Sequence, residues 1–210
     1  MSDTVINGPA YRVFTRRLLL RCWQPADAPL LKAAVDASLD HLLPWMPWAK
    51  YEPTDLQAKI ERLRRFRGAF DLGDDFVYGV FDRQETRVLG GSGLHTRLGE
   101  KAREIGYWIH VDAVGQGFAT ELSAALTKVA FEIDHVERVE IHCDPRNLRS
   151  AAVPRKLGYT LDATLRQRLR DTNGNPRDVM IWSLLAAEYP HSPSAAAEIE
   201  AYDAAGRRIC

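Results

Sequence analysis

The sequence predicts a mixed α/β domain in which helices flank a mostly antiparallel, twisted sheet of about seven strands. Two observations predict this class. Seven segments carry the alternating or continuous apolar pattern of strands, and four others repeat apolar residues at helical spacing. Their order is strand, helix, helix, three strands, helix, strand, helix and two strands. This order is typical of an antiparallel meander followed by a strand–helix–strand unit.

The first strand is expected over residues 18–23, where apolar residues alternate, and Pro25 opens the first helix. Two prolines within residues 43–48 exclude a regular helix there. Thr54 is expected to open the second helix, because Thr54 and Gln57 have the spacing of a capping box.

The remaining elements follow the same two periodicities. The other expected strands cover residues 76–81, 88–94, 104–111, 139–143, 159–169 and 179–184. The third and fourth helices are expected over residues 118–130 and 147–157. The last two strands surround Asn173–Gly174, which is a strong hairpin signal.

One domain is expected over residues 11–189. The segment from Pro190 to Pro193 indicates a linker, so residues 190–210 are expected to be a C-terminal extension. Within it, residues 195–205 are expected either to form a short helix or to stay frayed.

The composition narrows the classes of function. The chain has 28 basic and 28 acidic residues, which disfavours a protein that coats nucleic acid. No signal pattern occupies Met1 to Pro9 and no apolar run could span a membrane, so we expect a cytoplasmic protein without a membrane partner. The three cysteines are far apart and no histidine–cysteine cluster has metal spacing, so neither disulfides nor a metal are expected. Monomer and homodimer are both open.

The most informative stretch is residues 108–120, where an apolar strand leads through a loop directly into an amphipathic helix. Gly115 and Gly117 let backbone amides approach an anion without interference from a Cβ. The start of the helix adds unpaired N–H groups and a partial positive charge. The pattern therefore favours a phosphate site, with a tight turn that binds nothing as the alternative.

Four short motifs give this loop its context. They are Glu-Ile-Gly-Tyr-Trp (104–108), Gly-Gln-Gly-Phe-Ala-Thr-Glu (115–121), Asp-Pro-Arg-Asn-Leu-Arg-Ser (144–150) and Lys-Leu-Gly-Tyr (156–159). Their combination resembles the GNAT acetyltransferases, and more closely the Rim-type ribosomal-protein N-terminal acetyltransferases. The resemblance extends from about Arg16 to Leu185. It implies a GNAT-like fold and transfer of an acetyl group from acetyl-CoA to a primary amine.

The resemblance also implies how acetyl-CoA would bind. The residues whose backbone amides would hold the CoA pyrophosphate are Gly115, Gln116, Gly117, Phe118, Ala119 and Thr120. The pantetheine arm would lie in a cleft between the fourth and fifth expected strands and pair with the backbone of Ile109 and Val111. Asn147 and Ser150 match the family's Asn-x-x-Ser, which contacts the arm near the sulfur.

Two positions depart from the family pattern. Val114 stands where the family loop usually begins with arginine or glutamine, so that contact is missing or comes from elsewhere, with Arg155 and Lys156 as candidates. Pro154 stands where many members have a tyrosine proposed as general acid. A tyrosine acid at that position is therefore excluded.

Transfer to an amine needs a base. Deprotonation at neutral pH costs about 4 kcal/mol for a lysine amine and about 1 kcal/mol for a chain-terminal amine. Glu104 is the first candidate base, because it opens the strand that would carry the cofactor and the family places a carboxylate there. An ion pair with Arg103 or Arg138 is the alternative role. Asp162 is a second candidate, although a solvated edge-strand carboxylate is the expected role.

Ser150 is the candidate proton donor or water organiser at the leaving sulfur, with helix capping as the alternative. A backbone amide near Ile109 would polarise the thioester carbonyl. His95, His110 and His142 are expected to be hydrogen-bonded residues without a catalytic role.

The segment 43–48 carries bulky apolar side chains on an irregular loop. Trp45, Met46 and Trp48 are candidates for acceptor contact, because the corresponding family segment lines the acceptor side. A loop folded onto the core and a dimer contact are the alternatives. The hairpin 168–178 is the candidate for the other wall of that cleft.

The leading function is acetylation of a protein N-terminal amine. Acetylation of a small amine, such as a polyamine, an amino acid or an antibiotic, is the first alternative, and a donor such as succinyl-CoA is also open. The alternative from another class is a regulatory module that binds CoA without turnover. A ribosome accessory that binds nucleic acid is disfavoured by the neutral net charge.

Overall fold

A nine-stranded sheet organises the computed structural model, which describes residues 9–210. The strands are β1 (Arg12–Phe14), β2 (Leu18–Cys22), β3 (Phe76–Asp82), β4 (Val88–His95), β5 (Ala102–Ile109), β6 (Arg138–Cys143), β7 (Thr160–Arg170), β8 (Pro176–Leu185) and β9 (Glu200–Tyr202). Their order across the sheet is β7-β8-β6-β5-β4-β3-β2-β1-β9. Every neighbouring pair is antiparallel except β5 and β6.

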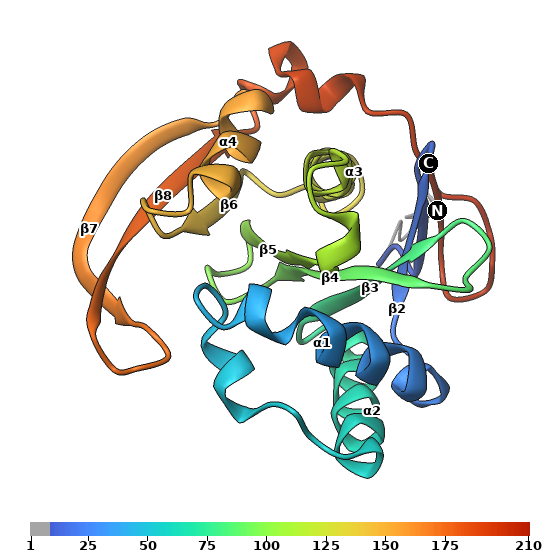
Figure 1. Ribbon diagram of the computed structural model, residues 1–210. Helices are drawn as coiled ribbons and strands as arrows, with labels where there is room; N and C mark the ends of the chain where they lie inside the picture. Colours follow the sequence, from blue (N-terminus) through green and yellow to red (C-terminus); the bar gives the residue numbers. More distant parts are fainter. Residues whose placement is uncertain (1–8) are drawn as a thin grey trace.

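Helices cover both faces of the sheet (Figure 1). The α-helices are α1 (Ala28–Leu42), α2 (Leu56–Leu72), α3 (Phe118–Glu132) and α4 (Leu148–Lys156). Short 3-10 helices are η1 (Pro25–Asp27), η2 (Pro47–Tyr51), η3 (Val111–Ala113), η4 (Tyr189–His191) and η5 (Pro193–Ala196). The expected class, a mixed and mostly antiparallel sheet with flanking helices, is confirmed.

The two faces bury separate clusters of apolar side chains. On one face, α1 and α2 pack against alternate residues of the sheet, such as Leu19 and Phe81. On the other face, α3 and α4 pack against residues such as Ile105 and Ile141. Because successive side chains of a strand point to opposite faces, each side chain of β5 and β6 faces one helical layer or the other.

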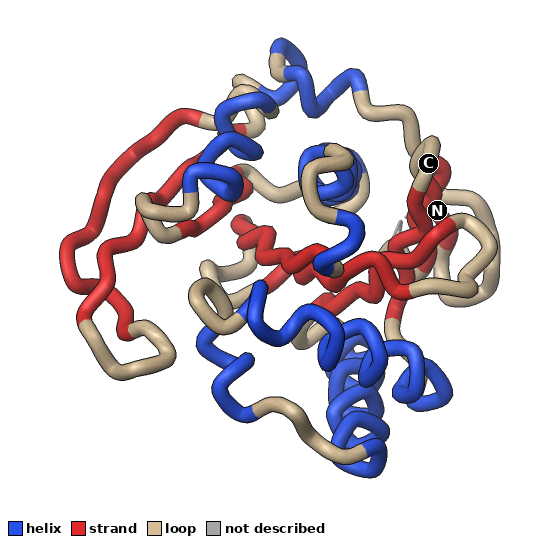
Figure 2. Tube along the Cα trace, viewed as in Figure 1, coloured by secondary structure: helices blue, strands red, loops and turns tan. Residues whose placement is uncertain are grey.

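Nine strands exceed the seven expected, because β1 and β9 are too short to leave a periodic signal. The expectation of a helical or frayed segment over residues 195–205 is wrong. The chain runs through η5 past α3 and then forms β9, which pairs with β1 at the edge of the sheet (Figure 2). Ala201 is fully buried there, and its backbone also pairs with Ile209 and Cys210. Unpaired backbone at the sheet edge therefore outweighs the helical propensity of the alanine-rich segment.

The start of α2 also differs from the expectation. Asp55, rather than Thr54, is the N-cap, and its carboxylate accepts the amide of Ala58 at 2.7 Å. The Thr54 amide and hydroxyl instead donate to Glu52, at 2.8 and 3.0 Å. No helix within residues 9–210 is long and apolar enough to cross a membrane. The signal-peptide prediction concerns Met1 to Pro9 and falls almost wholly outside the described residues.

Glu52 ties the loop between α1 and α2 to α2. Its carboxylate pairs with Lys59 Nζ at 2.7 Å and with Arg62, and both Glu52 and Lys59 side chains are fully buried. Burial raises the pKa of Glu52, but the hydrogen bonds from Lys59 and Arg62 outweigh burial and lower it to about 2. The charged form of this carboxylate therefore stabilises the fold.

We expect Glu52→Gln to lower the free energy of unfolding by about 3–5 kcal/mol, because it leaves the Lys59 charge buried without a counter-ion. Chemical denaturation at neutral pH measures this change. The matched control is Glu61→Gln, which removes an exposed pair with Arg64 and should change stability by less than about 1 kcal/mol. Equal stabilities of the two variants would contradict this role of Glu52.

The same pair predicts a pH dependence. Because the folded-state pKa of Glu52 lies below its ordinary value, its contribution is present above pH 4.5 and is lost as the pH falls towards 2. Glu52→Gln should lack this part of the acid destabilisation, which denaturation curves across that range would reveal.

Candidate active site

The neighbouring strands β5 and β6 are joined for only part of their length. Three parallel residue pairs connect them, and the last pairs Glu104 with Glu140. Beyond this point β5 stays paired with β4 as far as Ile109, whereas β6 stays paired with β8 as far as Cys143. The two strands therefore part beyond this pair, at the place where the cleft between the fourth and fifth expected strands was predicted (Figure 1).

Backbone groups of β5 face this opening. The amide of His110 donates to the carbonyl of Leu89, at the start of β4, at 2.8 Å. Since the backbone groups of successive strand residues point to opposite sides, those of Ile109 and Tyr107 point away from β4 and towards β6. Ile109 is thus placed as expected for pairing with an extended ligand.

Val111 is placed differently from the expectation. The strand ends at Ile109, and Val111 begins η3. Its amide donates to Ser38 Oγ on α1 at 3.1 Å, so it is not free for a ligand. The expectation of a strand that continues to Val111 is wrong, because η3 turns the chain towards α3.

The glycine loop forms a set of unpaired amides at the N-terminus of α3. Gly115 and Gly117 have φ of 81° and 83°, a conformation that residues with a Cβ rarely adopt. No residue of the described part of the chain accepts a hydrogen bond from the amides of residues 115–120, whereas the amide of Glu121 donates to Gly117 at 3.0 Å. This is the geometry of an anion site at a helix N-terminus. The residues expected to hold a pyrophosphate, from Gly115 to Thr120, are brought together here.

Arg17, which no sequence pattern singles out, binds this loop from the turn between β1 and β2. Its guanidinium donates to the carbonyl of Gln116 at 2.9 Å and to Glu121 at 2.6 Å, and it lies 4.5 Å from the centre of the Phe118 ring. Glu121 lies in the first turn of α3, where its negative charge would oppose an anion. Arg17 compensates that charge.

Arg17 is also relevant to Val114, which stands where the family loop usually has arginine or glutamine. Arg155 and Lys156 were the expected sources of a replacement cation, but the Arg155 guanidinium lies over the ring of Trp182 on β8, 5.6 Å from its centre. Among residues 9–210, Arg17 is the basic side chain hydrogen-bonded to the loop. No sequence signal identifies it, because it lies 99 residues before Gln116.

A hydroxyl cluster lies on the α4 side of the opening. Tyr107, from β5, places its hydroxyl 3.1 Å from Ser150 Oγ and donates to the Ser150 carbonyl at 3.3 Å. Burial raises the pKa of Tyr107, and the hydrogen bond with Ser150 only partly offsets this, so the hydroxyl remains a donor. Asn147 is the N-cap of α4, with its Oδ1 accepting the Ser150 amide at 3.1 Å. The Ser150 hydroxyl is therefore not the cap and is turned towards Tyr107.

Pro154 lies within α4 and is buried. No tyrosine reaches the site from that position, as expected, but the Tyr107 hydroxyl reaches Ser150 from the opposite strand. The sequence could not indicate this, because the contact spans 43 residues and depends on where β5 and β6 part.

Glu104 lies on the opposite face, which α1 and α2 cover. Its carboxylate accepts two hydrogen bonds from Arg97, one of them at 2.7 Å, instead of pairing with Arg103 or Arg138. Burial raises the pKa of Glu104, but the hydrogen bonds from Arg97 and the charges of His142 and Arg97 lower it overall. Glu104 is therefore ionised at neutral pH and weakly basic.

The three histidines separate into two groups. His95 Nδ1 is 2.9 Å from a carboxylate oxygen of Asp75, and His110 Nδ1 accepts the amide of Asp112 at 3.1 Å, so both are hydrogen-bonded as expected. His142 Nε2 lies 2.6 Å from Glu140, but its Nδ1 is 3.6 Å from Glu104, beyond hydrogen-bond distance.

The irregular loop after α1 faces the β7–β8 hairpin. A cavity of about 450 Å³ separates them and is lined by Leu43, Pro44, Trp45, Arg146, Asp171, Thr172 and Asn173. Arg177 on β8 donates to the carbonyl of Trp45 at 3.1 Å and so holds the two walls together. The hairpin thus forms the other wall of the cavity, as expected.

The three apolar candidates on this loop have different surroundings. Trp45 lines the cavity, whereas Trp48 packs edge-on against Trp108 of β5, with ring centres 6.2 Å apart. Met46 is half-buried, and its amide donates to Leu42 at the end of α1. Acceptor contact stays a prediction for all three, and Trp48 also takes part in the packing over β5.

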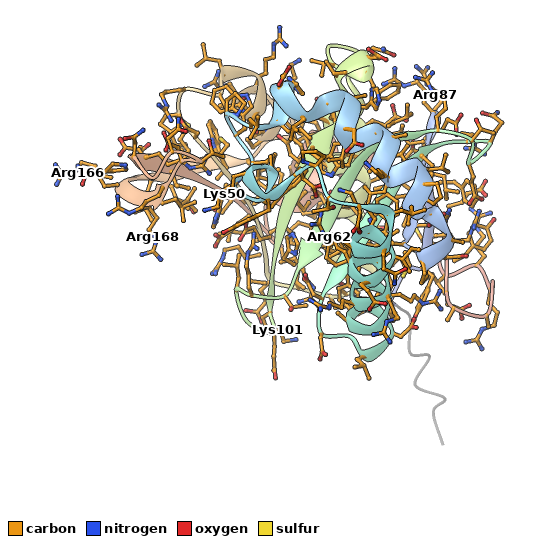
Figure 3. All side chains as sticks on the ribbon, turned by 60° about the horizontal axis from the view of Figure 1, so that its bottom comes forward. Lys50, Arg62, Arg87, Lys101, Arg166 and Arg168 are labelled. Carbon is orange, nitrogen blue, oxygen red and sulfur yellow. The ribbon has the colours of Figure 1, made fainter. Side chains whose placement is uncertain are left out.

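The remaining candidates add little to the site. Asp162 is exposed on the edge strand β7, as expected for a solvated carboxylate. Within residues 9–210 no group of three metal-ligating side chains is arranged to hold a metal ion, so the prediction of a metal-free enzyme stays a prediction. The basic side chains labelled in Figure 3 lie on separate parts of the surface, with Arg166 and Arg168 projecting from β7.

Comparisons with known proteins agree with this geometry. A family model described as an acetyltransferase (GNAT) domain matches residues 17–160. The ribosomal protein uS5-alanine N-acetyltransferase of Escherichia coli is 25% identical over 188 residues, which are 87% of this chain and 95% of the relative. A putative ribosomal N-acetyltransferase of Bacillus subtilis is 27% identical over 179 residues, 82% of this chain and 93% of the relative.

Solved structures share the fold. A probable acetyltransferase matches with a TM-score of 0.76 and 27% identity, over 83% of this chain and 98% of that one. A ribosomal-protein α-N-acetyltransferase in complex with coenzyme A matches with a TM-score of 0.73 and 23% identity, over 81% of this chain and 95% of that one. Together with the parted strands and the amide-lined loop, the family match shows that this chain belongs to the GNAT acetyltransferase family and is an acetyl-CoA-dependent N-acetyltransferase.

Proposed function

We propose that this enzyme acetylates the α-amino group at the N-terminus of a protein. The observation that carries the proposal is the cavity between the loop after α1 and the β7–β8 hairpin. Leu43, Pro44 and Trp45 give it an apolar wall, and the hairpin residues 171–173 give it a polar one. Such a cavity suits the first residues of an extended chain, with apolar contact on one side and hydrogen bonds on the other.

The charges of the cavity favour this acceptor over a polyamine. Arg146 and Asp171 both line it, so it has no net negative charge to attract a polycation. Asp144 further pairs with Arg146, at 2.7 Å. The relatives from Escherichia coli and Bacillus subtilis are named for ribosomal acceptors, which supports a protein substrate.

The charge of Glu104, on the α1–α2 face, favours an α-amine over a lysine as acceptor. Deprotonation at pH 7 costs about 4 kcal/mol for a lysine amine and about 1 kcal/mol for an α-amine. Because the pKa of Glu104 is lowered, this carboxylate is too weak a base to deprotonate a lysine efficiently. An N-terminal amine needs only the weaker assistance that this site offers.

In the proposed complex, the amides of residues 115–120 hold the CoA pyrophosphate, and the pantetheine arm pairs with the backbone of Ile109. Asn147 caps α4 and so fixes Ser150 near the sulfur. A backbone amide near Ile109 polarises the thioester carbonyl. The acceptor enters from the α1–α2 face, on which Glu104 lies.

The reaction is a direct displacement. The neutral amine nitrogen attacks the carbonyl carbon, a new C–N bond forms, and collapse of the tetrahedral intermediate breaks the C–S bond. The nitrogen loses its second proton and the CoA thiolate gains one. The Tyr107 and Ser150 hydroxyls supply hydrogen bonds to that thiolate, and their 3.1 Å contact lets a proton pass between them.

We expect acetyl-CoA to stabilise the protein against heat by about 2.7 kcal/mol when it is present at 100 times its Kd. CoA and succinyl-CoA are measured beside it, and a larger shift with succinyl-CoA would identify a different donor. No shift with any of the three would contradict the site formed by residues 115–120.

The acceptor is tested with short peptides that start with alanine or serine and contain no lysine. We expect release of free CoA with these peptides and none with the same peptides acetylated at the N-terminus. A blocked peptide with an internal lysine is the matched control for lysine acetylation. Turnover of spermidine or of the blocked lysine peptide, but not of the free N-terminus, would overturn the proposed acceptor. Binding of acetyl-CoA without any turnover would favour a regulatory module.

We expect Arg17→Gln to weaken CoA binding about tenfold, because the carbonyl of Gln116 loses its donor and Glu121 keeps an uncompensated charge near the phosphates. Isothermal titration measures the Kd. Arg16→Gln is the matched control, since Arg16 is exposed and adjacent. Equal Kd values for the two variants would show that Arg17 does not shape the phosphate site.

Glu104→Gln should lower kcat/KM for the alanine peptide about a hundredfold, since it removes a carboxylate from the face by which the amine is proposed to enter. The Kd for acetyl-CoA should stay unchanged. Glu100→Gln, in the exposed turn before β5, is the control. Turnover equal to that of the control would remove Glu104 from the mechanism.

A further inference from the structure

Three charged or titratable residues lie in a row where β5 and β6 part. Glu104 and Glu140 face each other in the last residue pair between the strands. His142 follows Glu140 by two residues, so its side chain lies on the same face of the sheet. This is the face that α1 and α2 cover, from which the proposed acceptor enters.

The imidazole of His142 lies between the two carboxylates. Its Nε2 is 2.6 Å from Glu140 Oε2, and its Nδ1 is 3.6 Å from Glu104 Oε2. Because an ionised carboxylate only accepts hydrogen bonds, the contact with Glu140 requires that Nε2 carries the hydrogen. Nδ1 then carries no hydrogen, and no residue within 9–210 donates a hydrogen bond to it; Glu104 Oε2 lies 3.6 Å away.

Two arginines pair with the carboxylates of this row. Arg97 neutralises Glu104, and Arg138 pairs with Glu140 at 2.7 Å. On the neighbouring strand β8, Ile181 lies opposite His142 and Ser183 opposite Glu140, and neither titrates near neutral pH. On β4, His95 lies opposite Glu104 and is bound by Asp75. Each carboxylate thus has a counter-charge other than His142.

Glu104 and His142 differ in their freedom to accept a proton. Both oxygens of Glu104 accept hydrogen bonds from Arg97, and its side chain is 9% exposed. The His142 side chain is 24% exposed and keeps an unpaired nitrogen. Histidine is also the side chain that most often acts as a general acid or base in enzymes.

We infer that His142 is the general base of this enzyme, that Glu140 fixes its tautomer, and that Glu104 stabilises the imidazolium that forms. The inference rests on the proposed function, because it places the acceptor amine beside Nδ1. Nδ1 takes one proton from the substrate ammonium group and passes it to water through its exposed side. The resulting neutral amine attacks the thioester, forming the C–N bond and breaking the C–S bond. The second amine proton neutralises the departing CoA thiolate, so one proton is released per turnover.

The first test compares His142→Gln with the wild-type enzyme on an alanine peptide. We expect kcat/KM at pH 7 to fall about 10²–10⁴-fold, the usual contribution of a general base. The Kd for acetyl-CoA should remain within about twofold. The loss should shrink towards pH 9, where an α-amine is neutral without help. A merely structural role for His142 would lower activity equally at every pH.

Two further variants sharpen this test. His191→Gln, in the exposed turn η4, is the matched control and should behave as wild type. Glu140→Gln should lower kcat with little change in KM, since it frees the ring to adopt the other tautomer. Nitrogen-15 NMR of the imidazole should show the hydrogen of neutral His142 on Nε2 in the wild-type protein.

The outcomes are distinguishable. His142→Gln with the kcat/KM of His191→Gln, or a wild-type tautomer with its hydrogen on Nδ1, would overturn the role of His142 and leave the proposed function intact. Loss of activity in Glu104→Gln but not in His142→Gln would assign the base to Glu104. Binding of acetyl-CoA without acetylation of any N-terminal peptide would overturn the proposed function and this inference with it.

Discussion

The point at which β5 and β6 part governs the rest of the site. Three pairs of residues hold these parallel strands together, and beyond Glu104 and Glu140 each strand keeps only its outer partner. Beyond this point, backbone groups that a continuous sheet would pair with each other have no partner strand. Because unpaired buried amides and carbonyls cost free energy, this backbone favours binding of an extended ligand. The antiparallel strands on either side make this arrangement stable, because β4 pairs with β5 from Glu104 to Ile109 and β8 pairs with the whole of β6.

The opening separates two chemical environments. On the α3–α4 face lie the loop amides and the hydroxyls of Tyr107 and Ser150, which in the proposed complex donate hydrogen bonds to CoA and its leaving thiolate. On the α1–α2 face lie Glu104, Glu140 and His142, which in the proposed complex accept protons or hydrogen bonds from the amine. The alternation of side chains along β5 and β6 produces this separation without any further device. In the proposed complex, the donor thus binds on one side of the sheet, and the amine reaches its thioester carbonyl carbon from the other side.

Charge pairs place several of these groups. Arg17 joins the turn before β2 to the start of α3, and Arg97 holds Glu104 at the opening. The buried pair of Glu52 and Lys59 secures the start of α2, the helix that follows the irregular loop after α1. Such partly buried pairs contribute orientation more than net stability, because desolvation offsets much of their attraction. Their effect is therefore geometric: they fix the positions of the loop before α3, of Glu104 and of the start of α2.

Local sequence patterns were enough to predict the class of the fold, the seven longer strands, the four α-helices and the glycine loop, because periodicity and glycine placement act locally. They also indicated Asn147 as the start of α4 and the hairpin around Gly174. These patterns missed β9, because a short edge strand forms only beside its partner β1. They also placed the cap of α2 at Thr54 instead of Asp55, because both side chains have oxygens that can accept the first amides of the helix. Three contacts became visible in the folded chain alone: Arg17 with the loop, Tyr107 with Ser150, and His142 with two glutamates. The first two contacts join residues far apart in the sequence, and Glu140 and His142 have a spacing that any strand shows. The register of the strands and the point where β5 and β6 part bring these residues together.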